Sequence, residues 1–338
     1  MPTAPKRIQE MLTAFWMSKT LFTGVELGVF DELSKGPASA EVLAYRLRLH
    51  PGALERLMNA LVALELVQKE SGRFSNSEEA ALYLVKGQQG YLGAQVEHLS
   101  QLHWRLWQLL PGAIRENTPR VKEVFGPGFD MLAAVYAEPR QLRGFVQGMH
   151  NLTVPDAQEI VDAVDFSPYS CLLDVGGTSG ALVIATLRRH QHLRGIVFEQ
   201  PAVCAIADDY LRQYGVDDRA RTHPGDFFEP GSLPTEADVI ALGWILHDWP
   251  DEQCHVILRH CFEALRPGGI ILVCEKLLDD SGTGPLLTTL MDLHALVSTG
   301  GQERSAGVYS QWLEQAGFRD VDVKLLQGNR DLVIAQKP

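Results

Sequence analysis

Residues 171–181 read Cys-Leu-Leu-Asp-Val-Gly-Gly-Thr-Ser-Gly-Ala, an apolar segment that ends near an acid and runs into a glycine-rich turn. An apolar strand followed by closely spaced glycines and a helix is typical of the cofactor loop of an α/β domain. Gly176, Gly177 and Gly180 allow a sharp turn and a close approach to a ligand, and the following helix offers unpaired N–H groups. The stretch predicts a cofactor loop, although a tight corner without a ligand would show the same pattern.

The chemistry around this loop indicates the kind of ligand. Its spacing is G-G-x-x-G, which differs from the dinucleotide fingerprint G-x-G-x-x-G. Asp174 lies at the carboxyl end of the predicted strand, where open α/β sheets bind their ligands. A carboxylate there suits a positively charged ligand better than a pyrophosphate, and these features favour S-adenosylmethionine.

Length and charge restrict the possible functions. A chain of 338 residues, 46% of them hydrophobic, exceeds what one core usually serves, so we expect two domains. The formal net charge of −12 disfavours binding to nucleic acid or to an anionic membrane. We expect a small-molecule or protein partner, and, because no signal-type or membrane-spanning apolar run is present, a cytoplasmic location.

The cysteines predict a reduced protein. They are odd in number and lack C-x-x-C spacing, so we interpret them as core residues. The five are Cys171, Cys204, Cys254, Cys261 and Cys274.

Residues 8–110 have helical periodicity with almost no strand signal. Helices are expected over 39–47 and 51–66, followed by a short hairpin that turns near Gly72, which is a winged-helix outline. Residues 1–90 hold ten Lys/Arg and ten Asp/Glu, so the electrostatic footprint of a DNA-binding domain is missing. We favour a dimerisation or substrate-lid role for this part.

Residues 91–150 remain helical and are rich in large side chains. As a set they predict either an aromatic pocket or an ordinary helical core. The set comprises His98, His103, Trp104, Trp107, Phe125, Phe129, Met131, Tyr136, Phe145, Met149 and His150.

After Pro155 strands and helices alternate, which predicts a doubly wound, mostly parallel sheet of the Rossmann-like α/β class. The change of pattern places a helical domain at 1–155 and a cofactor-binding domain at 156–338. Strands are expected at Cys171–Val175, Gly195–Glu199, Asp238–Trp244, Gly269–Glu275, Phe318–Leu325 and Leu332–Gln336.

Six motifs occur in one order along the chain: the loop 174–180, Val197-Phe-Glu-Gln-Pro201, Gly225-Asp-Phe-Phe228, Trp244-Ile-Leu-His-Asp-Trp-Pro250, Leu265-Arg-Pro-Gly-Gly269 and Gly300-Gly-Gln-Glu-Arg304. Together they resemble the S-adenosylmethionine-dependent O-methyltransferases of the acetylserotonin (hydroxyindole) and plant phenolic class. The resemblance spans essentially the whole chain and implies a homodimer formed through the helical front half.

The resemblance also implies the cofactor contacts. The loop glycines, beside Asp174, would pass close to the methionine end and ribose of S-adenosylmethionine. Glu199 would accept hydrogen bonds from the ribose hydroxyls, and Asp226 and Phe227 would hold the adenine. The chain departs from the family in having Glu199 where aspartate is usual and Thr178-Ser179 where glycine is common.

By the same resemblance, His247 would be the general base. A phenol is mostly neutral at pH 7, so a group must take its proton as the oxygen attacks the methyl group. Glu275 and Glu303 would flank the imidazole, fix its tautomer and stabilise the imidazolium. Alternatives remain for both acids, since Glu275 resembles a simple strand-end acid and Glu303 could form a structural ion pair with Arg304.

The expected substrate is a small aromatic hydroxyl compound, and the product of the cofactor is S-adenosylhomocysteine. The side chains expected to hold the substrate are Trp104, Met149, Trp244, Asp248, Met291 and His294.

His294 keeps a second hypothesis open, because the acetylserotonin enzymes have asparagine there. With His247 and Asp248 it would form a two-histidine, one-carboxylate set able to hold a divalent metal. Such a metal would stabilise the enolate of a 2-oxo acid for methylation at its β-carbon. A third hypothesis, a non-catalytic cofactor sensor, is disfavoured by the presence of His247, Glu275 and Glu303.

Overall fold

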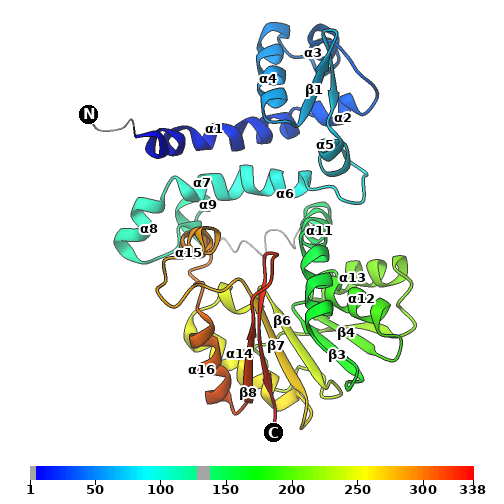
Figure 1. Ribbon diagram of the computed structural model, residues 1–338, viewed down its shortest axis with the longest axis vertical. Coiled ribbons are helices and arrows are strands. Elements are labelled where there is room, and N and C mark those ends of the chain that lie inside the picture. Colours follow the sequence, from blue (N-terminus) through cyan, green and yellow to red (C-terminus); the bar gives the residue numbers. More distant parts are fainter. Residues whose placement is uncertain (1–4, 128–137) are drawn as a thin grey trace. The chain divides into compact units, whose positions relative to one another are not determined.

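The computed structural model describes residues 5–127 and 138–338. The chain divides into two compact units, Met1–Trp104 and Arg105–Pro338 (Figure 1). The predictions made for Phe129, Met131 and Tyr136 lie outside the described residues.

The first unit has the winged-helix outline expected from the sequence. Ser39 caps α3 by accepting a hydrogen bond from the backbone of Val42, and Pro51 opens α4. The hairpin turns at Ser71-Gly72, both of which have positive φ, as tight two-residue turns require. The elements are α1 (Lys6–Glu26), α2 (Val29–Leu33), α3 (Ala40–Leu47), α4 (Pro51–Ala63), β1 (Val67–Glu70), β2 (Arg73–Asn76), α5 (Glu78–Tyr83), α6 (Gly93–His98) and the π-helix η1 (Leu99–His103).

The second unit is a seven-stranded sheet with order β5-β4-β3-β6-β7-β9-β8, in which β9 is antiparallel to both of its neighbours and the other pairs are parallel. The doubly wound fold is therefore confirmed. Its strands are β3 (Cys171–Val175), β4 (Arg194–Glu199), β5 (Ala220–Pro224), β6 (Val239–Gly243), β7 (Ile270–Glu275), β8 (Arg319–Lys324) and β9 (Asp331–Gln336). The six expected strands are all present, and β5 is an additional one at the edge.

Helices cover both faces of this sheet (Figure 1). One core packs α11, α12 and α13 against the sheet, and the other packs α14 and α16. The helices are α7 (Trp104–Trp107), which crosses the division between the units, α8 (Leu110–Glu116), α9 (Val121–Phe125), α11 (Pro139–Ala163), α12 (Ala181–Arg189), α13 (Pro201–Gln213), the 3-10 turn η2 (Leu246–Asp248), α14 (Asp251–Ala264), α15 (Leu286–Ser298) and α16 (Ala306–Ala316). All five cysteines are buried and free, as predicted.

The expected division after residue 155 lies inside α11, which runs unbroken past Pro155. This helix packs along α12 and belongs to the second unit, which begins at Arg105. The change of sequence pattern at Pro155 thus lies within a helix that flanks the sheet.

The topology fixes where a ligand can bind. The sheet extends from β3 toward β4 in one direction and toward β6 in the other, so the chain connections diverge between β3 and β6. Open α/β sheets bind ligands in the crevice at the carboxyl ends of such strands. None of the helices that the structure describes could cross a bilayer, and the cytoplasmic location stays a prediction.

Candidate active site

The glycine loop follows β3 as expected. Gly176 and Gly180 have φ of +72° and +78°, a conformation that side chains with a Cβ rarely adopt. A Cβ on Gly177 would lie 2.6 Å from Oδ2 of Asp174, so this position is restricted by space. The backbone N–H of Gly176 donates to the carbonyl of Phe198 at 2.8 Å, which ties the loop to β4.

Two carboxylates lie beside this loop. Asp174 is 5% exposed, and burial raises its pKa to about 7. Desolvation likewise raises the pKa of Glu199 to about 7, and the charge of Asp174 adds to that rise. Two acids that lose solvation together fit a ligand that brings positive charge and hydroxyl donors, as S-adenosylmethionine does.

The predicted adenine contacts lie after β5. One carboxylate oxygen of Asp226 accepts a hydrogen bond from the backbone of Phe228 at 2.8 Å. The ring of Phe227 packs edge-to-face on Phe228 and on Trp249. These contacts give the loop a fixed shape, and the adenine contacts themselves stay predictions.

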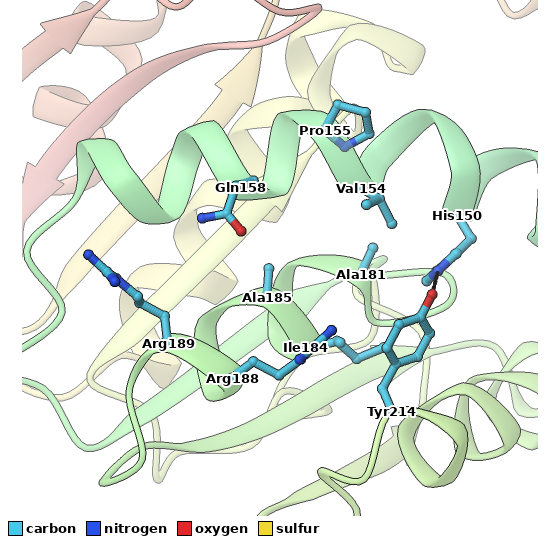
Figure 2. Close-up of a pocket in the computed structure, with 10 residues that line it drawn as sticks. All are labelled: His150, Val154, Pro155, Gln158, Ala181, Ile184, Ala185, Arg188, Arg189 and Tyr214. Carbon is cyan, nitrogen blue, oxygen red and sulfur yellow. Dashed lines mark hydrogen bonds between the residues drawn. The ribbon is translucent and has the colours of Figure 1, made fainter. Parts of the chain in front are cut away.

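His150 lies against the glycine loop. Its Nδ1 lies 2.8 Å from Oγ of Ser179 and its Nε2 lies 3.0 Å from the hydroxyl of Tyr214. Burial lowers its pKa to about 4, so the imidazole is neutral. Figure 2 shows His150 and Tyr214 at one end of a cavity of about 540 Å³ between α11 and α12, which includes none of the predicted catalytic residues.

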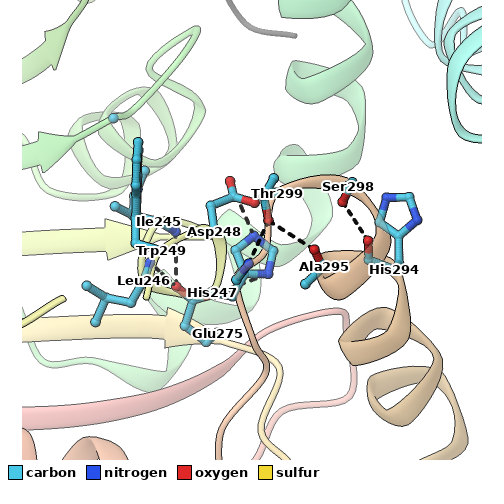
Figure 3. Close-up of polar contacts among 12 residues, drawn as sticks. Ile245, Leu246, His247, Asp248, Trp249, Glu275, His294, Ala295, Ser298 and Thr299 are labelled. Atoms are coloured by element: carbon cyan, nitrogen blue, oxygen red, sulfur yellow. Dashed lines mark hydrogen bonds and ion pairs between the residues drawn. The ribbon is translucent and has the colours of Figure 1, made fainter. Parts of the chain in front are cut away.

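His247 lies on the 3-10 turn that follows β6, at the carboxyl edge of the sheet. Its Nδ1 lies 2.8 Å from Oε1 of Glu303. Nδ1 also lies 4.0 Å from Oε2 of Glu275, and Nε2 lies 3.9 Å from Oδ2 of Asp248 (Figure 3). The structure therefore brings together the three predicted catalytic residues, and Glu303 is the direct partner of the imidazole.

Glu275 combines two roles. Its Oε1 accepts hydrogen bonds from the backbone of Ile245 at 3.0 Å and of Leu246 at 2.8 Å, which fixes the start of the turn that carries His247. Its Oε2 has no hydrogen-bond partner among the described residues and lies 4.0 Å from Nδ1 of His247. The strand-end acid is thus a structural anchor and a source of charge for His247.

Arg304 is not the partner of Glu303. Its guanidinium pairs with Asp251 at 2.7 Å and donates to the carbonyls of Leu246, Trp249 and Gln302. The arginine therefore clamps the far end of the His247 segment, and the carboxylate of Glu303 remains free to bind the imidazole.

The electrostatics favour a charged imidazole. Burial disfavours the imidazolium of His247, but the carboxylate of Glu275 and then those of Asp248 and Glu303 outweigh it, raising the pKa to about 10. Burial also raises the pKa of Glu275, and the charge of His247 opposes that rise. A proton taken up by His247 is consequently well stabilised.

The predicted substrate residues fall into different settings. The backbone of Trp244 has a φ of +55°. The centroid of its ring lies 6.3 Å from that of the His247 ring, and the two ring planes meet at 21°. The side chain of Asp248 is hydrogen-bonded to Thr299. On α15, Met291 is half-buried, and Nδ1 of His294 accepts a hydrogen bond from Trp107 Nε1 at 3.0 Å.

The two remaining predicted substrate residues are less informative. Met149 is half-buried on α11. Trp104 belongs to the first unit, where its ring contacts Phe22 and Phe15 of α1. Their contact with substrate stays a prediction.

The metal-binding set proposed from the sequence is not assembled. In the described chain, the histidine and carboxylate donors that converge within 4.8 Å are His247, Glu275 and Glu303. His294 instead directs Nδ1 to the indole of Trp107.

Comparison with known proteins decides the family. A family model of the O-methyltransferase domain matches residues 107–319, and one of the O-methyltransferase dimerisation domain matches residues 9–86. The chain belongs to the O-methyltransferase family.

Individual relatives agree over the whole length. Acetylserotonin O-methyltransferase of Bos taurus is 35% identical over 337 residues, 98% of this chain and 97% of the relative. The 3-hydroxy-5-methyl-1-naphthoate 3-O-methyltransferase of Streptomyces sahachiroi is 34% identical, with 94% and 90% covered. The crystal structure of human N-acetylserotonin methyltransferase with S-adenosylmethionine has a TM-score of 0.90 at 31% identity and covers 100% and 98%.

This O-methyltransferase uses S-adenosylmethionine as methyl donor. The relatives support O-methylation and not the metal-dependent C-methylation considered from the sequence, in agreement with the position of His294.

Three residues of the site were not predicted, and a fourth, Trp107, is predicted only as a member of the aromatic set of residues 91–150. Asp251 and Thr299 carry no motif signal. Asp292 accepts the backbone N–H of Glu303 at 2.9 Å and so holds the acid in place. Such partners are separated in sequence, and only the fold brings them together.

Glu303→Gln is expected to shift the pH profile of kcat/KM. In its predicted role as general base, His247 must be neutral to accept a proton, so activity should rise with pH toward the raised pKa of this imidazole. Removing one carboxylate lowers that pKa, so the rising limb should move to lower pH, while the maximum rate falls by about 10- to 100-fold. Initial rates from pH 6 to about 10 test this, and an unmoved limb would contradict the electrostatic role of Glu303.

Proposed function

We propose that the chain methylates the hydroxyl group of a small aromatic compound, with His247 as the general base. The observation that supports this most strongly is the imidazole of His247, held at Nδ1 by Glu303 at 2.8 Å. The segment that carries it also touches the glycine loop, because a Cβ on Gly176 would lie 2.3 Å from Cδ1 of Ile245. Base and cofactor loop are therefore neighbours.

The hydrogen bond to Glu303 defines which nitrogen reacts. A carboxylate only accepts hydrogen bonds, so in neutral His247 the proton resides on Nδ1 and Nε2 carries the free lone pair. Nε2 takes the hydroxyl proton of the substrate as the oxygen becomes nucleophilic. Glu303 and Glu275 then stabilise the imidazolium.

The residues of the glycine loop, with Asp174, Glu199, Asp226 and Phe227, would hold the cofactor. When bound, S-adenosylmethionine supplies an electrophilic methyl group on a sulfonium that leaves as a neutral thioether. No acid is needed for that leaving group, so the protein has to deprotonate the nucleophile and align it.

An aromatic substrate is supported by the surroundings of the base and by a relative. Trp244 offers a ring beside His247, and α15 contributes Met291 and His294. One relative is named for a hydroxynaphthoate. The substrate would place its ring against these side chains and its hydroxyl at Nε2 of His247.

His247→Gln tests the proposal directly. Glutamine keeps a polar side chain but cannot accept the proton, so turnover should fall by at least about 100-fold, while affinity for S-adenosylhomocysteine stays close to that of the wild type. Transfer from labelled S-adenosylmethionine to a panel of phenols, with calorimetry for the cofactor, measures both. The exposed His192→Gln variant is the matched control, and full turnover by His247→Gln would refute the general-base role.

His294→Asn is expected to change the preference among substrates. The substitution shortens the side chain that Trp107 holds, so kcat/KM values within a panel of hydroxyarenes should reorder by about 10-fold, with cofactor affinity unchanged. Trp107→Phe removes the same hydrogen bond and should reproduce part of the change. An unaltered substrate ranking in both variants would remove His294 from the substrate site.

We also propose that the first unit forms a homodimer and that the second unit carries the catalytic residues. The match to the dimerisation domain supports this, as does the outer face of α1. Five apolar side chains of that helix, each more than half exposed, follow helical spacing: Ile8, Met11, Leu12, Phe15 and Trp16. An apolar stripe of this kind is typical of a surface that a second chain covers.

Two charges placed on this stripe should yield a monomer. The double variant Leu12→Glu and Phe15→Glu would bury carboxylates in the interface, and a desolvated charge without a partner is strongly unfavourable. Light scattering after size exclusion should show half the wild-type mass, whereas Gln9→Glu on the same helix should leave the mass unchanged. A wild-type protein that is already monomeric would refute the dimer.

A further inference from the structure

Arg330 is a buried cation between the predicted cofactor acid and the catalytic segment. It immediately precedes β9 and is 5% exposed. Nη2 donates to Oγ1 of Thr153 at 3.1 Å, and Nε lies 3.8 Å from Oδ2 of Asp156, both on α11. The centre of the guanidinium lies 4.6 Å from the centroid of the Trp244 ring, a cation–π distance.

The sheet provides the space for this side chain. Because side chains alternate along a strand, Ala241 and Gly243 of β6 face the same core, the one beneath α11 and α12. A Cβ on Gly243 would lie 2.6 Å from Nη1 of Arg330. The guanidinium of Arg330 thus occupies the space that a side chain larger than glycine at residue 243 would fill.

The contacts of Arg330 differ from those of an arginine that only holds structure. Arg304 binds Asp251 and three backbone carbonyls. Arg330 meets its nearest acid, Asp156, only at 3.8 Å, and its Nε has no hydrogen-bond partner among the described residues. Much of its positive charge is therefore left for other groups.

The charge of Arg330 acts on three buried acids, one from each neighbouring element. Asp156 lies on α11, Asp174 at the end of β3 and Glu275 at the end of β7. Burial raises the pKa of each, and Arg330 opposes that rise in all three. The ring of Trp244, which the guanidinium contacts, is stacked near His247.

We propose that Arg330 is a positioning residue for methyl transfer, which supplies a buried positive charge beneath the cofactor loop and holds Trp244 beside His247. The proposal rests on the function proposed above, since it takes Asp174 as a cofactor contact and His247 as the base. Arg330 itself is buried against α11 and β6 and does not act on the reacting atoms.

The test compares Arg330→Met and Arg330→Lys in the full-length protein, with exposed Arg319→Met as the matched control. Calorimetry with S-adenosylhomocysteine from pH 6 to 9 needs no methyl transfer. Arg330→Met should bind about 10-fold more weakly near pH 7, because the pKa of Asp174 rises, and should recover toward pH 9. Arg330→Lys should restore the pH dependence of binding, but its turnover should stay reduced because an ammonium cannot lie flat on the Trp244 ring.

Gly243→Ala provides a second variant that keeps the charge and moves the guanidinium. If the position of Arg330 matters, Gly243→Ala should also bind S-adenosylhomocysteine more weakly near pH 7. It serves as the test variant if Arg330→Met does not fold. Binding that weakens equally at every pH, or wild-type behaviour of both variants, would overturn the proposal. A failure of the general base would instead appear in His247→Gln turnover and leave these binding curves intact.

Discussion

The carboxylate of Glu275 is the constraint on which the active site depends. It ends a central strand, is fully buried, and uses one oxygen to bind two successive backbone N–H groups of the segment after β6. A buried amide without a partner costs roughly 1–3 kcal/mol, so the segment has one strongly preferred path over the sheet edge. That path places His247 within reach of Glu303, and Arg304 fixes its other end.

Close approaches at glycines complete this arrangement. Gly176 lets the cofactor loop touch Ile245, and a Cβ on Gly301 would meet the carbonyl of His247 at 2.0 Å. Each contact brings a separate loop against the same catalytic segment. Backbone packing, more than long side chains, therefore sets the distance between the base and the cofactor loop.

Sequence reasoning found the features that depend on local pattern. The strands with continuous apolar runs, the glycine loop and the order of the motifs could all be read from the chain. It missed β5, whose sequence Ala-Arg-Thr-His-Pro is polar and half-exposed at the sheet edge. It also placed the change to alternating strands and helices at Pro155, a residue that lies inside α11.

The remaining site residues could not be predicted because their partners are distant in sequence. Trp107 and His294 are 187 residues apart, and Arg330 follows Gly-Asn, a pattern typical of an exposed turn. Its burial arises only when α11 and β6 close around it. The alternative prediction of a metal site at His247, Asp248 and His294 was wrong for the same reason. His294 accepts a hydrogen bond from the indole of Trp107, a contact that no motif indicated.

The surplus of acids around the reacting centre follows from the charge balance of the reaction. Asp174 and Glu199 lie beside the glycine loop, where the cationic donor is proposed to bind, and Glu275 and Glu303 lie beside His247, the proposed base. In the proposed reaction, neutral His247 would take the substrate proton, and its positive charge would replace the one lost with the methyl group. The acids around the site would then face one positive charge before and after the reaction, which would remove most of the electrostatic penalty of moving that charge across a buried site.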